Sequence, residues 1–443
     1  MKKKYTNIVS KIVAIPILLF IIMGSWHYWN HQKTIVLEFG MFTGSNWDVE
    51  NADAFVIIDR VIERFERKHP KVKVKYISGI DKKDYSEWCA KRMLLGKLPD
   101  VFMVLDNDFN QYCTLGVLEK LNSYMREDRD FHENELFYTA LSSGRGIGEE
   151  DVQYGLPYEV VPTLLFVNKT LLKKEGIQVP KKDWTWEDFF EICKKITKDT
   201  DQDGRVDQFG TYDYTWLHAL YTSGGKFFDD KKEKLEFTNS KVIEAIKFMK
   251  SLNELNQGEN VTKEDFLAGK VAFMPLTFAE YRTYKTYPYK IKKYTNFQWD
   301  CTTFPASKRG NNVSKVDTLL LSISRSSKHK KLAWELLKEF VYNEESQTDI
   351  FRFSQGVPVK KSVAGSSNAL SIIQREMDKG EQVISGELLC NVIENGVIVP
   401  KFHQYEQIVG LANTEIGEIF DKDKDVESSI KIFQRKINQY LNK

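Results

Sequence analysis

Apolar and polar positions follow two different periods along the first hundred residues. TIVLEFG (34–40) is a short apolar run that ends at glycine, and KVKVKYI (71–77) alternates, so both predict strands. Between them, DAFVIIDRVIERFERKHP (53–70) repeats apolar residues every three or four positions and ends at proline, which predicts a helix. A polar helix (84–95) and the apolar strand DVFMVLD (100–106) follow. This order predicts a parallel sheet with right-handed crossovers, and so the α/β class.

The rest of the chain continues this pattern. A long apolar strand lies within YGLPYEVVPTLLFVNKTLLKKEGI (154–177), and Thr185 is placed to cap a helix that has Glu187 and Asp188 in its first turn. Apolar segments return at 272–281, 297–305 and 316–324, and the last 40 residues have helical periodicity. A chain of 443 residues is too long for one core, so two lobes are expected.

The N-terminus has the pattern of an export signal. Lys2, Lys3 and Lys4 precede the apolar run IVAIPILLFIIM (12–23), which as a helix would span about 18 Å against a hydrocarbon core of about 30 Å. No cysteine follows closely, the first being Cys89, and no clean cleavage site is evident. Residues 1–33 are therefore expected to be a signal peptide or a retained membrane anchor. Both alternatives place the protein outside the cell, associated with its surface.

Charge and cysteine content exclude several classes of protein. The formal charge is +2, but residues 1–33 hold five lysines and no acid, which leaves 59 basic and 62 acidic residues beyond them. Because no excess of positive charge remains, we expect no nucleic-acid partner. The five cysteines are odd in number and lack C-x-x-C spacing, so neither a disulfide framework nor a zinc site is expected.

An acidic loop, DTDQDGRVDQFG (199–210), opens like the calcium loop of an EF-hand. That loop needs oxygen ligands at positions 1, 3 and 5, glycine at 6 and a bidentate glutamate at 12. Position 12 is Gly210, and the residues that follow are extended and aromatic rather than helical. Two interpretations stay open: a solvated, glycine-turned loop, or a structural Ca²⁺. The ion would be held by Asp199, Asp201, Asp203, the Arg205 carbonyl and Asp207. No other cofactor is expected.

Six segments, in this order, carry a resemblance to a known family. They are LPDVFMVLDNDFNQYCTLGVLEKL, YGLPYEVVPTLLFVNKTLLKKEGI, WTWEDF, FLAGKVAFM, SKHKKLAWELLKEF and GVPVKKSV. Each is similar to a segment of the extracellular solute-binding proteins of ABC importers, in the carbohydrate-binding group that includes maltodextrin-binding proteins. The resemblance covers nearly the whole chain beyond the N-terminal segment.

The resemblance implies two α/β lobes of the periplasmic-binding-protein class II type, joined at a hinge around a cleft. The expected lobes are discontinuous: 34–159 with 302–350, and 160–301 with 351–443. The implied function is capture of a carbohydrate, expected to be an oligosaccharide, by hinge closure and its delivery to the transmembrane subunits of an ABC permease. The protein is expected to be a monomer that meets the membrane surface through its N-terminus.

Sugars present apolar C–H faces and a rim of hydroxyl groups, so a cleft needs aromatic platforms beside polar partners. At the strand ends of lobe one the candidates are Trp47, Asp48, Asp106, Asn107 and Asp108. At the lobe crossing they are Tyr158 and Glu159, and in lobe two Tyr214, Trp216, Thr277, Phe278, Glu280, Tyr281 and Asp317. The segment around Phe278 departs from the family's N-G-P-W loop. Tyr405 lies in a C-terminal segment that would close over the cleft, whereas Trp184, Trp186 and Trp334 are expected to be packing residues.

Other functions are weaker alternatives. The chain lacks G-x-S-x-G, H-E-x-x-H and a phosphate-binding glycine loop, so no enzyme is expected, although a secreted carbohydrate-active enzyme stays an alternative. A non-sugar solute, such as a peptide or a polyamine, is the other alternative. Because Arg282 and Lys285 are basic, an anionic glycan also stays open as the ligand.

Overall fold

The computed structural model describes residues 34–47, 49, 53–77, 79–146, 149–181, 183–229, 234–285, 297–375, 377, 383–399 and 404–441. The predicted signal peptide or anchor (1–33) lies outside these ranges. Within them, every helix is too short or too polar to serve as a membrane span.

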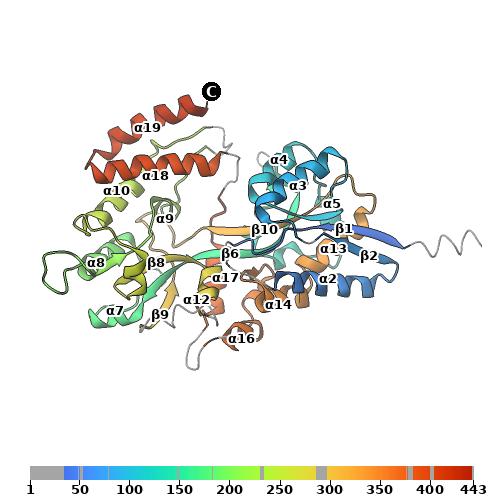
Figure 1. The fold of residues 1–443 in the computed structure, drawn as a ribbon, viewed down its shortest axis with the longest axis horizontal. Coiled ribbons are helices and arrows are strands. Elements are labelled where there is room, and N and C mark those ends of the chain that lie inside the picture. Colours follow the sequence, from blue (N-terminus) through green and yellow to red (C-terminus); the bar gives the residue numbers. More distant parts are fainter. Residues whose placement is uncertain are drawn as a thin grey trace, which may run out of the picture.

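A mixed sheet of nine strands runs through the molecule (Figure 1). Its main path is β2 (Val72–Tyr76), β1 (Ile35–Gly40), β3 (Val101–Val104), β10 (Val316–Ile323), β6 (Gly155–Asn168), β8 (Val271–Thr277) and β7 (Phe209–Thr211). Strands β9 (Trp299–Thr302) and β11 (Val357–Pro358) also pair with β6. A separate hairpin joins β4 (Arg145–Gly146) to β5 (Glu149–Gln153). The predicted parallel arrangement is confirmed for β2, β1 and β3, whereas β10 lies antiparallel to both β3 and β6.

Strand β6 connects the two halves of the sheet. Its first half pairs with β10 from Gly155 to Pro162, and its second half pairs with β8 and β9 from Thr163 to Asn168. All fourteen of its residues are buried, which explains why the sequence reads as one apolar run. In Figure 1, β6 and β10 cross the middle of the molecule, between the two lobes.

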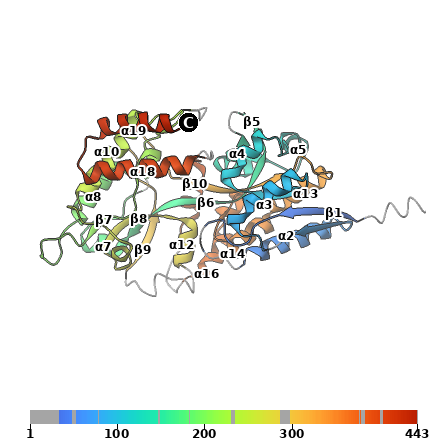
Figure 2. The ribbon, with the colours of Figure 1, turned by 45° about the horizontal axis from the view of Figure 1, so that its top comes forward.

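Helices cover the sheet in four runs along the chain. The first run is α2 (Ala54–Lys68), α3 (Lys82–Leu94), α4 (Asp106–Thr114), α5 (Asn122–Glu127), the 3-10 turn η1 (Glu133–Glu135) and α6 (Tyr138–Ser142). The second is α7 (Lys169–Lys174), α8 (Trp186–Ile196), α9 (Trp216–Thr222), α10 (Ser240–Glu254), α11 (Lys263–Leu267) and α12 (Phe278–Lys285). The third is α13 (Lys330–Val341), α14 (Glu344–Phe353), α15 (Lys361–Ala364), α16 (Ser367–Arg375) and α17 (Gly386–Glu394). The fourth is α18 (Tyr405–Asp421) and α19 (Val426–Leu441), which lie together on one lobe (Figure 2).

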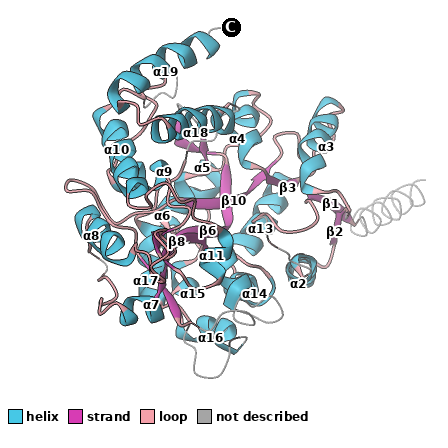
Figure 3. Ribbon diagram, turned by 60° about the vertical axis from the view of Figure 1, so that its left-hand side comes forward, coloured by secondary structure: helices cyan, strands magenta, loops and turns pink. Residues whose placement is uncertain are grey.

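Two hydrophobic clusters form the core, and the first extends from the first lobe along β6, β8 and β9 into the second. The first contains Phe39, Phe102 and Phe340, and the second contains Phe189 and Phe237, all almost completely buried. Helices α16 and α17 contribute to the first cluster, and α18 and α19 to the second. Figure 3 shows α16 at the bottom of the view and α19 at the top. The boundaries drawn from the sequence between the lobes stay a prediction.

The helix start predicted at Thr185 is confirmed in detail. The Thr185 hydroxyl accepts a hydrogen bond from the Asp188 amide at 3.2 Å, and the Asp188 carboxylate accepts one from the Thr185 amide at 2.8 Å. This capping box satisfies two of the amides that a helix leaves unpaired at its first turn. It fixes α8, which packs beside β7 in the second lobe.

Candidate ligand-binding cleft

A cavity of about 400 Å³ lies between the two lobes. The first lobe lines it with residues that follow β1, β2 and β3: Asn46, Trp47, Lys82, Ser86, Leu105, Asp106 and Asn107. The second lobe and the crossing segments supply Val161, Thr277, Lys315, Asp317, Val399, Tyr405 and Glu406. The cavity therefore lies at the carboxyl ends of the parallel strands, where open α/β sheets bind ligands.

The loop after β1 holds Trp47 at the wall of this cavity. The Trp47 amide donates to the Ser45 hydroxyl at 3.0 Å, and the Lys82 ammonium donates to the Asn46 carbonyl at 2.7 Å. The indole is half buried, so part of it lines the cavity while its buried Nε1 faces the Glu159 carboxylate. An aromatic plane fixed in this way is a suitable platform for a flat apolar ligand face.

Behind Trp47 lies the buried carboxylate of Glu159, on β6. It accepts a hydrogen bond from the Ser354 hydroxyl, and the Ser354 carbonyl accepts one from the buried Arg282 guanidinium at 2.5 Å. Burial raises the pKa of Glu159 to about 7, although Ser354, the Trp47 indole and the charge of Arg282 all act to lower it. A Cβ added to Gly356 would lie 2.5 Å from Glu159 Oε2 and 3.2 Å from Trp47 Nε1. Glu159 and Trp47 thus converge on one point beneath the cavity.

Charged groups of both signs surround the cavity, with acids in the majority. Lys315, the residue before the crossing strand β10, forms an ion pair at 3.1 Å with Asp317 on that strand. Burial acts to lower the pKa of Lys315, but Asp317, Glu406 and Asp106 outweigh it and raise that pKa. Three carboxylates therefore share the wall with two lysines, Lys315 and Lys82.

A further pair of acids lies beside the cavity. Burial, and then the charge of Glu280, raise the pKa of Asp213. Asp213 also has a φ of 56°, a conformation that Asp tolerates better than most residues. Glu280 itself accepts hydrogen bonds from the amide and the hydroxyl of Thr277, at 2.7 and 2.9 Å, and so fixes the end of β8 at the cavity.

The structure brings five of the predicted ligand residues together at the cavity: Trp47, Asp106, Asn107, Thr277 and Asp317. Asp48 lies outside the described residues. Asp108 lies behind Ser86, a residue of the cavity wall, and its carboxylate accepts a hydrogen bond from the Ser86 hydroxyl at 2.6 Å. Asp108 and Glu280 thus position the residues that line the wall.

The other predicted residues lie away from this cavity, in the two cores. Tyr158, Tyr214, Trp216, Phe278 and Tyr281 are all buried. The reason is visible at Trp216, which is the first residue of α9: the helix turns its ring into the second core, where its Nε1 donates to Asn413 at 2.7 Å. That these five residues contact a ligand stays a prediction, because none of them lines this cavity.

Sequence analysis did not single out Asn46, Lys82, Ser86, Val161, Lys315, Val399 and Glu406, which also line the cavity. A signal was present for three of them. Lys82 and Ser86 follow the second strand end, after Ile77, and Lys315, one residue before β10, alternates with Asp317. Glu406 and Val399 come from the C-terminal segment that sequence analysis expected to close over the cleft, and Tyr405 of that segment also lines the cavity.

The acidic loop brings three of its carboxylates together. Oxygen atoms of Asp199, Asp201 and Asp203 lie within 4.8 Å of one another. The Asp199 carboxylate accepts a hydrogen bond from the Gly204 amide at 2.8 Å. Asp207 is instead bound to Thr200 and Lys270, and the Arg205 side chain pairs with Glu259 at 2.8 Å. The arrangement fits both a solvated loop and a calcium loop, so calcium stays a prediction.

Melting with and without calcium distinguishes these two interpretations. If the loop binds Ca²⁺, an ion concentration about 100 times its Kd stabilises the fold by about 2.7 kcal/mol, because the ion binds only the folded state. Asp201→Asn/Asp203→Asn should abolish this effect and leave the calcium-free melting temperature nearly unchanged, because both side chains are exposed. A melting curve that calcium does not move would show a solvated loop.

Comparison with known proteins agrees with the fold and the cleft. The family model for bacterial extracellular solute-binding proteins matches residues 50–348. An uncharacterized lipoprotein of Streptomyces antibioticus is 23% identical over 314 residues, which cover 63% of this chain and 62% of the lipoprotein. A galactooligosaccharide-binding protein of Bacillus subtilis is 25% identical over 330 residues, covering 69% and 70% of the two chains.

Among solved structures, the sugar-binding protein MalE of Xanthomonas citri has a TM-score of 0.73 at 16% identity, covering 92% of this chain and 97% of MalE. At this identity the similarity establishes the fold: two lobes of α/β structure around a mixed sheet. The family match, which spans more than half of the sequence, establishes the wider relationship. The chain belongs to the bacterial extracellular solute-binding protein family.

Proposed function

We propose that this protein is the extracellular substrate-binding subunit of a carbohydrate importer and binds its sugar in the cavity between the lobes. The observation that carries the proposal is the position of Trp47, whose indole lines a cavity beside polar groups of both lobes. Cavities of about 300–1,000 Å³ with a few placed polar groups are typical ligand sites, and this one holds about 400 Å³. The names of the Bacillus and Xanthomonas relatives support a sugar as the ligand.

Closure of the lobes is part of the proposal. The first lobe contributes Trp47 and Asp106, the second Thr277 and Glu406, and a ligand that touches both binds the closed form better than the open one. That difference shifts the population toward the closed form, which a permease would recognise. The family consists of binding proteins, and a cleft that closes around an unchanged ligand needs no catalytic group.

The charge of the cleft favours neutral over anionic glycans. Asp106, Asp317 and Glu406 outnumber the two lysines of the wall, so an anionic sugar would meet net repulsion. Arg282, which sequence analysis considered as a partner for an anionic glycan, is buried and donates to the Ser354 carbonyl. The side chain of Lys285 lies outside the described region. The same acidic surplus makes a cationic solute, such as a polyamine, the second candidate.

A ligand panel followed by tryptophan fluorescence tests the function. We expect neutral oligosaccharides to change the emission with a Kd near the micromolar range, about −8 kcal/mol, and anionic sugars to bind far more weakly. Small-angle scattering with the best ligand should show a smaller radius of gyration as the lobes close. Binding of spermidine with no response to any glycan would favour the second candidate, and a product formed from an oligosaccharide would indicate an enzyme instead.

A further inference from the structure

One edge of the first lobe, opposite the cleft, gathers positive charge. Helices α3 and α4 begin at the cavity with Lys82 and Asp106, so their other ends lie about 20 and 14 Å away along the helix axes. There, segments 91–100 and 114–120 lie beside segment 325–331, which comprises the loop after β10 and the first residues of α13. We call these three segments the basic edge.

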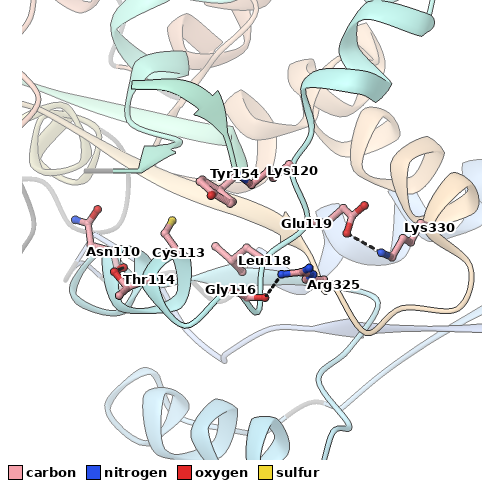
Figure 4. Close-up of a pocket in the computed structure, with 10 residues that line it drawn as sticks. All are labelled: Asn110, Cys113, Thr114, Gly116, Leu118, Glu119, Lys120, Tyr154, Arg325 and Lys330. Carbon is pink, nitrogen blue, oxygen red and sulfur yellow. Dashed lines mark hydrogen bonds and ion pairs between the residues drawn. The ribbon is translucent and has the colours of Figure 1, made fainter. Parts of the chain in front are cut away.

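Hydrogen bonds join the three segments into one surface. The Asp100 carboxylate accepts from the Ser327 hydroxyl at 2.5 Å and also from the Glu38 amide on β1 at 2.9 Å. The Arg325 amide donates to the Val117 carbonyl at 2.8 Å. In Figure 4, the Arg325 guanidinium reaches the Gly116 carbonyl and Lys330 reaches Glu119, around a cavity of about 670 Å³.

The basic edge is far more positive than the chain as a whole. It holds eight Lys and Arg residues against two acids, Asp100 and Glu119, although residues beyond 33 carry a slight excess of acid. Both acids are already bound within the surface. Lys97, Arg325, Lys328 and Lys331 are exposed, and the described part of the chain offers no ion pair to any of them. The near-neutral total charge of the chain does not reveal this local excess of positive charge.

Exposed leucines stand among these cations. Leu94 and Leu95, at the end of α3, are 88% and 67% exposed, and Leu115, at the end of α4, is 56% exposed. Leu94 is the most exposed large apolar side chain among the described residues. A polyanion in solution would gain nothing from these leucines, whereas a lipid surface would accept them and the cations together.

The chain also enters the fold beside this edge. Strand β1 starts at Ile35, three residues before Glu38, whose carboxylate pairs with Arg92 of the basic edge. The N-terminal apolar run ends at Met23, and the eleven residues from there to Thr34 reach at most about 40 Å when fully extended. If a bilayer holds that run, it stays within about 40 Å of the start of β1.

We propose that the basic edge is a docking surface for anionic lipid, on which the first lobe lies with Leu94, Leu95 and Leu115 toward the bilayer and the cleft at the opposite end of α3 and α4. A single short anchor gives only marginal membrane binding, and a basic patch supplies the second signal that makes it stable. Each cation near an anionic surface adds about a factor of five in binding, from about 1 kcal/mol. The proposal does not depend on which solute the cleft binds.

Hydrogen exchange of the full chain on vesicles tests the proposal. On phosphatidylglycerol vesicles, the amides of 91–100, 114–120 and 325–331 should exchange more slowly than on phosphatidylcholine vesicles. Raising the salt from about 0.1 M to about 1 M shortens the screening length from about 10 to about 3 Å and should remove the difference. Equal exchange on both lipids, or slowing confined to other segments, would overturn the proposal.

Matched variants distinguish binding by the basic edge from an effect of the total charge of the protein. Lys97→Glu/Lys328→Glu/Lys331→Glu should lose the slowing on phosphatidylglycerol, whereas Lys173→Glu/Lys194→Glu/Lys195→Glu, an equal change on the second lobe, should keep it. All six lysines are exposed. Leu94→Ser/Leu95→Ser should weaken it as well. If the serine variant is slowed as much as the parent, or if soluble polyphosphate gives the same slowing, the surface binds polyanions and not lipid.

Discussion

Trp47→Ala should weaken binding of the preferred oligosaccharide by roughly sixtyfold. If the indole covers about 100 Å² of apolar ligand contact, its loss costs about 2.5 kcal/mol at about 25 cal/mol per Å², and each 1.4 kcal/mol is a factor of ten in Kd. The loop should survive the change, because the Ser45 hydroxyl and Lys82 ammonium bind its backbone and not the indole. Isothermal titration calorimetry of the variant and the parent measures this ratio.

Trp186→Ala is the control for this prediction. Trp186 stacks on Phe248 at a centroid distance of 4.4 Å in the second lobe, and it is absent from the cavity wall. Its loss should lower the melting temperature and leave Kd unchanged. An unchanged Kd in Trp47→Ala, with glycan binding intact in the parent, would mean that the sugar binds elsewhere. The solute-binding function itself would still hold.

The strand ends explain how much of the site could be predicted from sequence. Trp47, Asp106 and Asn107 follow strands whose carboxyl ends meet at one edge, so local pattern and the strand-end rule suffice for them. Tyr214 and Trp216 were chosen for their residue type, but no local pattern tells whether an aromatic ring faces a cleft or a core. Here the capped start of α9 turns Trp216 inward.

Long-range contacts account for the rest. Glu406 and Val399 reach the cavity because Lys315 bridges to Val397, a pairing between residues more than 80 positions apart. The sheet shows the same limit. Its parallel part, β2, β1 and β3, follows from alternating strands and helices, whereas the antiparallel insertion of β10 beside β6 depends on how the chain returns from the second lobe. The basic edge is likewise invisible in a total charge near zero.

Glu159→Gln should make the protein more stable at pH 8 and leave its stability near pH 4.5 almost unchanged. The pKa of Glu159 is raised from 4.5 to about 7 in the folded state, mainly by burial, so the unfolded chain releases this proton first as the pH rises. Stability therefore falls between about pH 4.5 and 7, by about 3 kcal/mol in total, and stays lower above that range. The neutral amide removes this loss, which urea unfolding at a series of pH values measures.

The groups around Glu159 sharpen the test. Arg282 carries a charge that opposes the shift, Tyr158 is a neighbouring ionisable group, and Ser354 donates to the carboxylate. Ser354→Ala removes a donor that favours the ionised form, so the pKa of Glu159 should rise further and the loss of stability should extend to higher pH. Equal pH dependence in the parent and in Glu159→Gln would show that this carboxylate is already ionised in the folded protein well below pH 7. In that case the Glu159 carboxylate, which lies between the crossing strand and Trp47, would be a buried charge stabilised by Arg282 and Ser354, and not a protonated carboxyl group.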